Sequence, residues 1–133
     1  MARWHRILLA VCGLILICAP AFAHHAFTSE FDGEKMVSFT GVLTKVDWVN
    51  PHAYLYVDSK EADGTTKQWI VETFPPTALR RSGMERDMLK IGKPIVVEGY
   101  AAKGGKALTW AHKVTVDGGQ TIVFAKDRGE NQK

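Results

Sequence analysis

Cysteine is scarce in this sequence and absent from most of it. The chain of 133 residues has two cysteines, Cys12 and Cys18, and both lie among the first 23 residues. Without that segment the chain has no thiol, which excludes a cysteine nucleophile, a thiolate metal site and a disulfide framework. Phosphate-binding glycine motifs, the Gly-x-Ser-x-Gly turn of hydrolases and the His-Glu-x-x-His helix of metalloproteases are also missing. A binding function is therefore more expected than an enzymatic one.

The sequence also lacks a strong excess of charge of one sign. It has 17 Lys and Arg residues against 14 Asp and Glu residues. Two arginines and no acidic residue lie in the first 23 positions, so the remaining chain has 15 basic and 14 acidic residues and a net charge of +1. Only Arg80 and Arg81 are adjacent. Because a nucleic-acid surface needs a denser basic cluster, we expect no nucleic-acid partner.

The amino-terminal segment has the pattern of a secretory signal peptide. Two arginines precede the apolar run of residues 7–18, and Ala-Phe-Ala at residues 21–23 provides the small side chains that signal peptidase requires. A membrane anchor is the alternative, but Pro20 interrupts the apolar stretch, which is shorter than the roughly 20 residues of a membrane span. We expect residues 1–23 to be cleaved, the protein to be periplasmic or secreted, and no stable membrane insertion afterwards.

The remaining chain alternates apolar and polar residues with the period of β-strands. The predicted strands are residues 36–48, 52–59, 67–74, 91–101, 108–116 and 121–125, and a short helix broken at Gly83 is predicted over residues 77–89. This order predicts an all-β fold with one short helix, an OB-like small β-barrel of five to six strands. A split β-sandwich is the alternative. The barrel is favoured because Gly41 lies where a long first strand has to bend.

The organisation predicted for the mature chain is a single domain. Residues 24–126 form this OB-like domain, which begins with an amino-terminal arm at residues 24–35, where alternation is absent. Residues 127–133 are polar and are expected to be a flexible tail.

Histidine is the most informative residue type for function. Cleavage after residue 23 would give His24 a free α-amine, and this amine can chelate one metal ion together with the imidazole of His24. His25 and His52 are candidates for a further ligand. Nitrogen ligands in a tetragonal arrangement favour Cu(II), which also leads the affinity order of the divalent metals. We therefore expect His24, His25 and His52 to bind copper; the alternative is an exposed arm whose histidines have no role.

Two neighbouring predicted strands supply further candidates. His52 begins the second strand, and alternation places it on one face with Tyr54 and Tyr56. Glu72 on the third strand can orient a ligating histidine or cap the metal site through its carboxylate, although a strand glutamate can also be solvated or pair with an arginine. The face of Tyr54 and Tyr56 can instead hold a small ligand, a peptide or a protein of the cell envelope without any metal.

Several segments together carry a family resemblance: residues 24–27, 39–48, 50–52, 69–72, 79–83, 86–87, 89–92 and 96–100. With these segments the chain resembles DUF6152, a family of small exported bacterial proteins of unknown function. The resemblance implies an exported protein with a small β-barrel and no established activity. It also implies that His24, His25, His52 and Glu72 match the His-His pair, the Asn-Pro-His turn and the Trp-x-x-Glu strand of the family. The expected functions are storage, delivery or protection of copper, or a binding module without metal.

Overall fold

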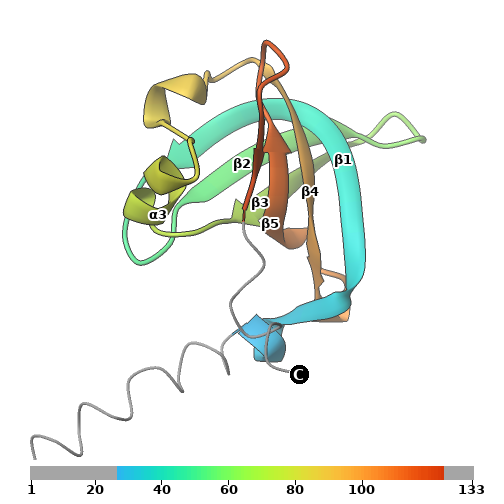
Figure 1. Cartoon of the computed structure of the whole chain (residues 1–133). Helices are drawn as coiled ribbons and strands as arrows, with labels where there is room; N and C mark the ends of the chain where they lie inside the picture. The colour runs from blue at the N-terminus through green and yellow to red at the C-terminus, as the bar shows by residue number, and fades with distance from the viewer. Residues whose placement is uncertain (1–26, 125–133) are drawn as a thin grey trace, which may run out of the picture. The chain divides into compact units, whose positions relative to one another are not determined.

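A computed structural model describes residues 27–124 of the chain (Figure 1). Residues 27–30 are helical and belong to a separate compact unit, so the unit that begins at Phe31 is described by itself. The expected signal peptide, the two histidines at positions 24 and 25 and the tail at residues 127–133 lie outside the described residues.

Between Phe31 and Phe124, the described part of this unit contains six strands and three short helical segments. They are β1 (Phe31–Asp47), β2 (Tyr54–Lys60), β3 (Thr66–Glu72), α3 (Pro76–Arg81), η1 (Arg86–Met88), β4 (Pro94–Ala102), η2 (Lys103–Gly105), β5 (Leu108–Thr115) and β6 (Thr121–Val123). The expected arm at residues 24–35 is wrong in its second half, because β1 already begins at Phe31. The reason is long-range: Phe31 is buried and pairs with Ala102 of β4.

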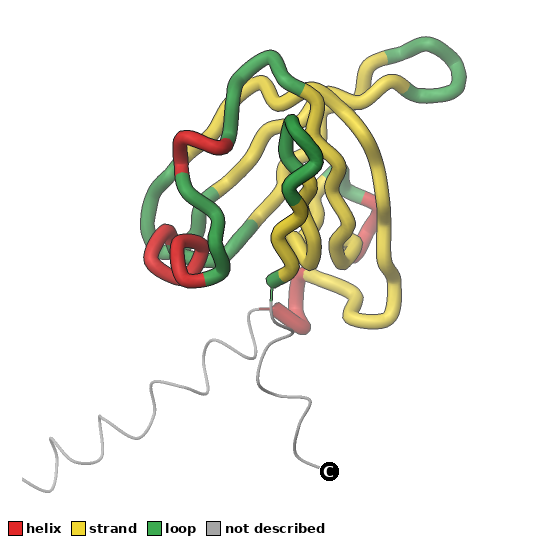
Figure 2. The backbone as a smooth tube through the Cα atoms, turned by 45° about the horizontal axis from the view of Figure 1, so that its top comes forward, coloured by secondary structure: helices red, strands yellow, loops and turns green. Residues whose placement is uncertain are grey.

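The sheet closes on itself. Its strand order is β3-β2-β1-β4-β5-β6, in which neighbours are antiparallel, and β3 pairs in addition with β5 in a parallel register. β6 continues along β5 beyond the segment that pairs with β3. Figure 2 shows the strands curving around a common interior. The prediction of an OB-like, mostly β fold, with three strands, a helix and further strands, is confirmed.

β1 is shared between two parts of the ring. Its residues 36–42 pair with β4 and its residues 42–47 pair with β2. Gly41 lies next to this change of partner, and a Cβ atom there would lie 2.5 Å from the Asp58 carbonyl oxygen. Glycine is therefore needed because the backbone of β2 passes very close to β1. The register shift itself falls after Leu43.

The segment between β3 and β4 completes the core and corrects the predicted helix. Leu79 of α3 is fully buried, as is Met84 after it. The expected helix over residues 77–89 ends at Arg81 because Gly83 takes a φ of +88° and the Met84 N–H donates to the Leu79 carbonyl at 2.9 Å, which terminates the helix. No helix in the described part of the chain has the length and apolar character required to cross a membrane.

The core is mainly apolar, although Thr73 and Thr109 are also fully buried. Its buried residues are Leu43, Ala53, Leu55, Val57, Val71, Leu79, Met84, Leu89, Ile95, Val97, Ala111, Val114, Val116, Ile122 and Phe124. They come from the inward faces of all six strands, from the loops between them and from the β3–β4 connection. The outward faces of the strands are thereby left to carry the polar and aromatic side chains of a binding site.

Candidate functional site

His52 and Glu72 form a hydrogen-bonded pair where β2 begins and β3 ends. His52 Nδ1 lies 2.5 Å from Glu72 Oε1. The register brings them together, because Glu72 pairs with Tyr54, two residues after His52. The His52 side chain is 34% exposed and that of Glu72 only 11%. The carboxylate therefore holds one ring nitrogen, and within the described residues no hydrogen bond engages the other nitrogen, Nε2.

Trp110 of β5 packs against this pair. The parallel pairing of β3 with β5 sets Trp110 beside Glu72, and the Trp110 and His52 rings meet edge to face with their centroids 5.1 Å apart. Phe31 and Phe74 contact the same indole, at 5.8 and 5.2 Å. A carboxylate and an aromatic cluster thus restrict the orientation of the imidazole. Trp110 is not among the sequence-predicted site residues, because nothing in the local sequence pattern signals that β3 pairs with β5.

Tyr56 belongs to a neighbouring polar network on the same outer face. Its hydroxyl donates to Asp47 Oδ2 at 3.1 Å, and Lys45 Nζ lies 2.8 Å from the same oxygen and 4.7 Å from the centre of the Tyr56 ring. Tyr54 lies between the two clusters, since it pairs with Asp47 of β1 and with Glu72 of β3. His52, Tyr54 and Tyr56 therefore lie along one outer surface, on which the Tyr56 hydroxyl is already engaged.

This network shifts the titration of Asp47 and Lys45. The hydrogen bond from Lys45 lowers the pKa of Asp47 below its ordinary 3.8, and that from Tyr56 lowers it further, while desolvation opposes both. The same contact with Asp47 raises the pKa of Lys45 above 10.5. A carboxyl with a depressed folded pKa stabilises the fold above its unfolded pKa, and that stabilisation disappears as the pH falls through the folded pKa.

Removal of the lysine should therefore raise the pKa of Asp47. In Lys45→Gln we expect the NMR titration midpoint of the Asp47 carboxyl to move up toward 3.8. Lys60→Gln is the matched control, because the Lys60 ammonium donates instead to Thr66 Oγ1 at 2.8 Å. An Asp47 midpoint that does not move in Lys45→Gln would contradict the assignment of the shift to Lys45.

The described residues do not form a complete metal site. Among residues 27–124, no three His, Cys, Asp or Glu side chains lie close enough together to hold a metal ion. His112, in the middle of β5, contacts Tyr100, with ring centroids 5.9 Å apart. The other two histidines of the expected metal site, His24 and His25, lie outside the described residues.

Comparisons with known families agree with the resemblance seen in the sequence. The model of a family of unknown function, DUF6152, matches residues 11–111, which is most of the chain. The resemblance is thus confirmed. A comparison with curated proteins finds no match.

Solved structures with a similar fold include three small proteins. The mitochondrial single-stranded DNA-binding protein Rim1 of S. cerevisiae has a TM-score of 0.48 and 14% identity over 62% of this chain and 92% of its own. The N-terminal domain of PriB from Thermoanaerobacter tencongensis has a TM-score of 0.41 and 14% identity, with coverage of 62% and 96%. The small single-stranded DNA-binding protein of Streptomyces coelicolor has a TM-score of 0.38 and 20% identity, with coverage of 62% and 91%.

One expectation about partners is corrected by these structures. The lack of a dense basic cluster predicts that nucleic acid is not a partner. That exclusion is not supported: Rim1 and the Streptomyces coelicolor protein, whose folds are similar, are single-stranded DNA-binding proteins. The physical reason is that net charge averages over the whole surface, whereas a single-stranded nucleic acid is held locally by stacking and by a few cations.

Proposed function

The chain belongs to the DUF6152 family, whose function is unknown, and we propose from its own residues that it is an exported protein that binds Cu(II). The observation that carries this proposal is the hydrogen bond between His52 Nδ1 and Glu72 Oε1. Histidines that ligate metals commonly donate their second ring nitrogen to a carboxylate, which fixes the tautomer and makes the ligating nitrogen more basic. In this arrangement His52 Nε2 is the ligating atom and Glu72 is its positioning residue.

The remaining ligands in this proposal come from the amino end. Cleavage after residue 23 in the periplasm would give His24 an α-amine and an imidazole for the same ion, and His25 would supply a further imidazole. This donor set consists of nitrogen atoms, which suits Cu(II). Since no nucleophile or cofactor motif accompanies it, the proposed role is storage, delivery or protection of copper rather than turnover.

The test is a Cu(II) titration of the protein purified from the periplasm, with its first residue established by mass. A competing chelator measures the affinity, and electron paramagnetic resonance counts the nitrogen ligands. We expect one Cu(II) per chain, bound through three or more nitrogens, and a loss of tight binding when one residue is added before His24. Weak binding at several sites, unchanged by that added residue, would contradict the proposal.

A second candidate is a binding module that needs no metal. It is favoured by a mixed apolar and aromatic area beside the histidine: Ile70 is 37% exposed and pairs across the strands with Tyr56 and Leu108. In this case Tyr54 and Tyr56 hold a small ligand or a peptide. Binding that persists in the presence of a chelator and is lost in Ile70→Ser distinguishes this candidate from the copper site.

A further inference from the structure

The connection between β3 and β4 concentrates positive charge on one side of the sheet. Its basic residues are Arg80, Arg81, Arg86, Lys90 and Lys93, and all five are exposed. The same segment contains two acidic residues, so residues 76–93 carry a net charge of +3. The other described residues from 31 to 124 have seven basic and nine acidic side chains, a net charge of −2. Figure 1 shows this basic connection, α3 to the start of β4, along one side of the strands.

The last turn of the basic connection presents an apolar tip between two lysines. Ile91 lies between Lys90 and Lys93 in the chain and is 54% exposed. The turn is fixed to β1, because the Gly92 N–H donates to the Leu43 carbonyl at 2.8 Å and the Leu43 N–H donates to the Lys93 carbonyl at 3.0 Å. Because the turn is fixed in place, the exposed Ile91 side chain is available for contact with an apolar partner or a membrane.

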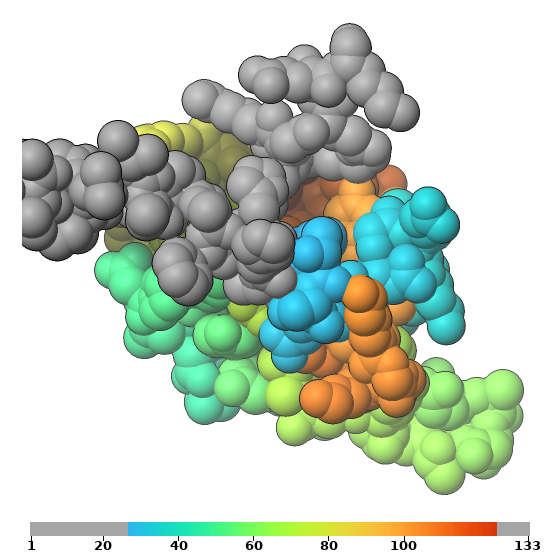
Figure 3. Space-filling view, turned by 90° about the horizontal axis from the view of Figure 1, so that it is seen from below, coloured from blue at the N-terminus to red at the C-terminus, as the bar shows by residue number. Residues whose placement is uncertain are grey.

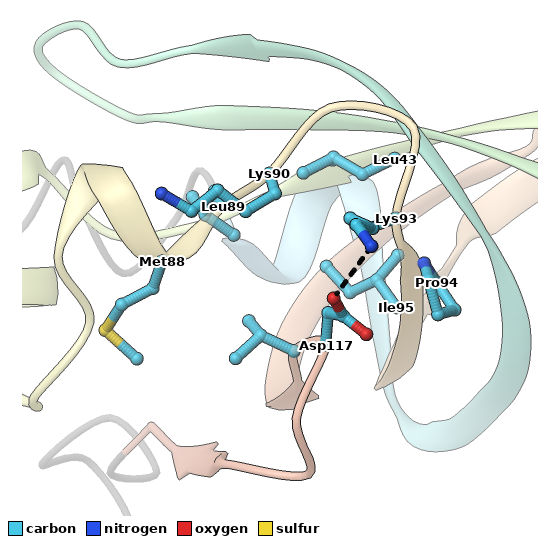
Figure 4. Close-up of a pocket in the computed structure, with 9 residues that line it drawn as sticks. Leu43, Met88, Leu89, Lys90, Lys93, Pro94, Ile95 and Asp117 are labelled. Carbon is cyan, nitrogen blue, oxygen red and sulfur yellow. Dashed lines mark ion pairs between the residues drawn. The ribbon is translucent and has the colours of Figure 1, made fainter.

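The side chains around this turn leave the lysines at the surface. Figure 4 shows Lys90 and Lys93 among the side chains that line a small pocket, together with Leu43 and Ile95. Lys93 lies 3.6 Å from Asp117, in an ion pair whose side chains are 57% and 41% exposed. Such an exposed pair is weak in water, so it leaves Lys93 able to meet another anion.

We propose that the basic connection docks this protein on an anionic phospholipid bilayer, with Ile91 entering the headgroup region between Lys90 and Lys93. Lysines and arginines near a bilayer are attracted by its negative surface potential, and an apolar side chain beside them adds affinity by leaving water. A nucleic acid is the other large anion, but residues 76–93 contain no aromatic side chain on which its bases could stack. The inference is independent of the copper site.

The electrostatic part of this attraction has an expected size and salt dependence. Removal of one lysine near an anionic bilayer should lower the partition coefficient about fivefold, and removal of two about thirtyfold. Salt should weaken the binding, because the Debye length shortens to about 8 Å at physiological ionic strength. Loss of the isoleucine should lower the partition coefficient by a further factor of about five.

The experiment is co-sedimentation of the chain with vesicles, using the same native amino terminus for every variant. Vesicles of phosphatidylglycerol and phosphatidylcholine in equal parts should bind the protein, and vesicles of phosphatidylcholine alone should not. The partition coefficient should fall about thirtyfold in the double variant K90Q/K93Q and about fivefold in Ile91→Ser.

Matched controls distinguish binding through the basic connection from a general effect of positive charge on vesicle binding. K103Q/K106Q removes the same charge from the turn between β4 and β5, which lies at the opposite end of β4 in Figure 1 and at the surface in Figure 3. Val123→Ser shortens another apolar side chain that is 56% exposed. Both should bind vesicles as the unaltered chain does.

Three results would overturn the proposal. One is equal binding to neutral and anionic vesicles, and another is an equal loss in K103Q/K106Q and K90Q/K93Q. The third is no vesicle binding together with binding of single-stranded oligothymidylate that K90Q/K93Q abolishes, which would assign the basic connection to nucleic acid instead.

Discussion

Gly99→Ala is expected to lower the free energy of unfolding by about 3 kcal/mol or more. A Cβ atom at Gly99 would lie 2.3 Å from the Trp110 carbonyl oxygen and 2.5 Å from Thr109 Oγ1. The first of these neighbours is backbone of β5, so it cannot move without breaking the pairing of β4 with β5. The register of these two strands also shifts at this point, between Glu98 and Gly99. Urea unfolding followed by tryptophan fluorescence measures the change.

The same substitution in an open turn is the control. Gly64 has a φ of +85°, and a Cβ atom there would have nothing within 4 Å. Gly64→Ala should therefore lower the free energy of unfolding by only about 1–2 kcal/mol, which is the cost of a left-handed backbone for an L-residue. Equal unfolding midpoints for the two variants would show that the close approach of β4 to β5 does not limit stability.

Under the proposed function, His52→Ala is expected to weaken Cu(II) binding by about a hundredfold or more, because it removes the proposed ligand nitrogen Nε2. Glu72→Gln should weaken it by about 10- to 100-fold, since the amide keeps the shape of the side chain and loses the charge that makes the imidazole a better ligand. A chelator competition assay measures both, and circular dichroism confirms that the variants are folded.

Two variants outside the pair serve as controls for this result. His112→Ala removes a histidine that contacts Tyr100 instead of Glu72, and Tyr56→Phe removes the hydroxyl that donates to Asp47. Both should bind Cu(II) as the unaltered chain does. If His52→Ala binds as tightly as His112→Ala, the His52–Glu72 pair has only a structural role.

Part of the site could be predicted because it depends on neighbouring strands. Alternation places His52 on the face of Tyr54 and Tyr56, and the hairpin signalled by Asp63-Gly64 aligns β2 with β3, which brings Glu72 beside Tyr54. A short hairpin sets register through local turn geometry. The sequence alone is therefore sufficient to propose a carboxylate on β3 as a partner of His52.

The contribution of Trp110 could not be predicted in the same way. Trp110 meets His52 only because β3 pairs in parallel with β5, across 38 positions of sequence from Glu72 to Trp110. Phe31 reaches the same cluster through its pairing with Ala102, and for the same reason its place in β1 could not be predicted. Contacts between distant segments leave no periodic signal in either segment.

What the sequence determined by itself was therefore the number and approximate positions of the strands, the outer face of Tyr54 and Tyr56, and the break at Gly83, because side-chain alternation and glycine conformation act over a few residues. Tertiary structure alone decided the closure of the sheet through β3 and β5, the packing of Trp110 against His52, and the close approaches that require Gly41 and Gly99. These features depend on which distant backbone segments lie side by side. That pairing is selected by burial of a common core, which forms only when all the strands are assembled.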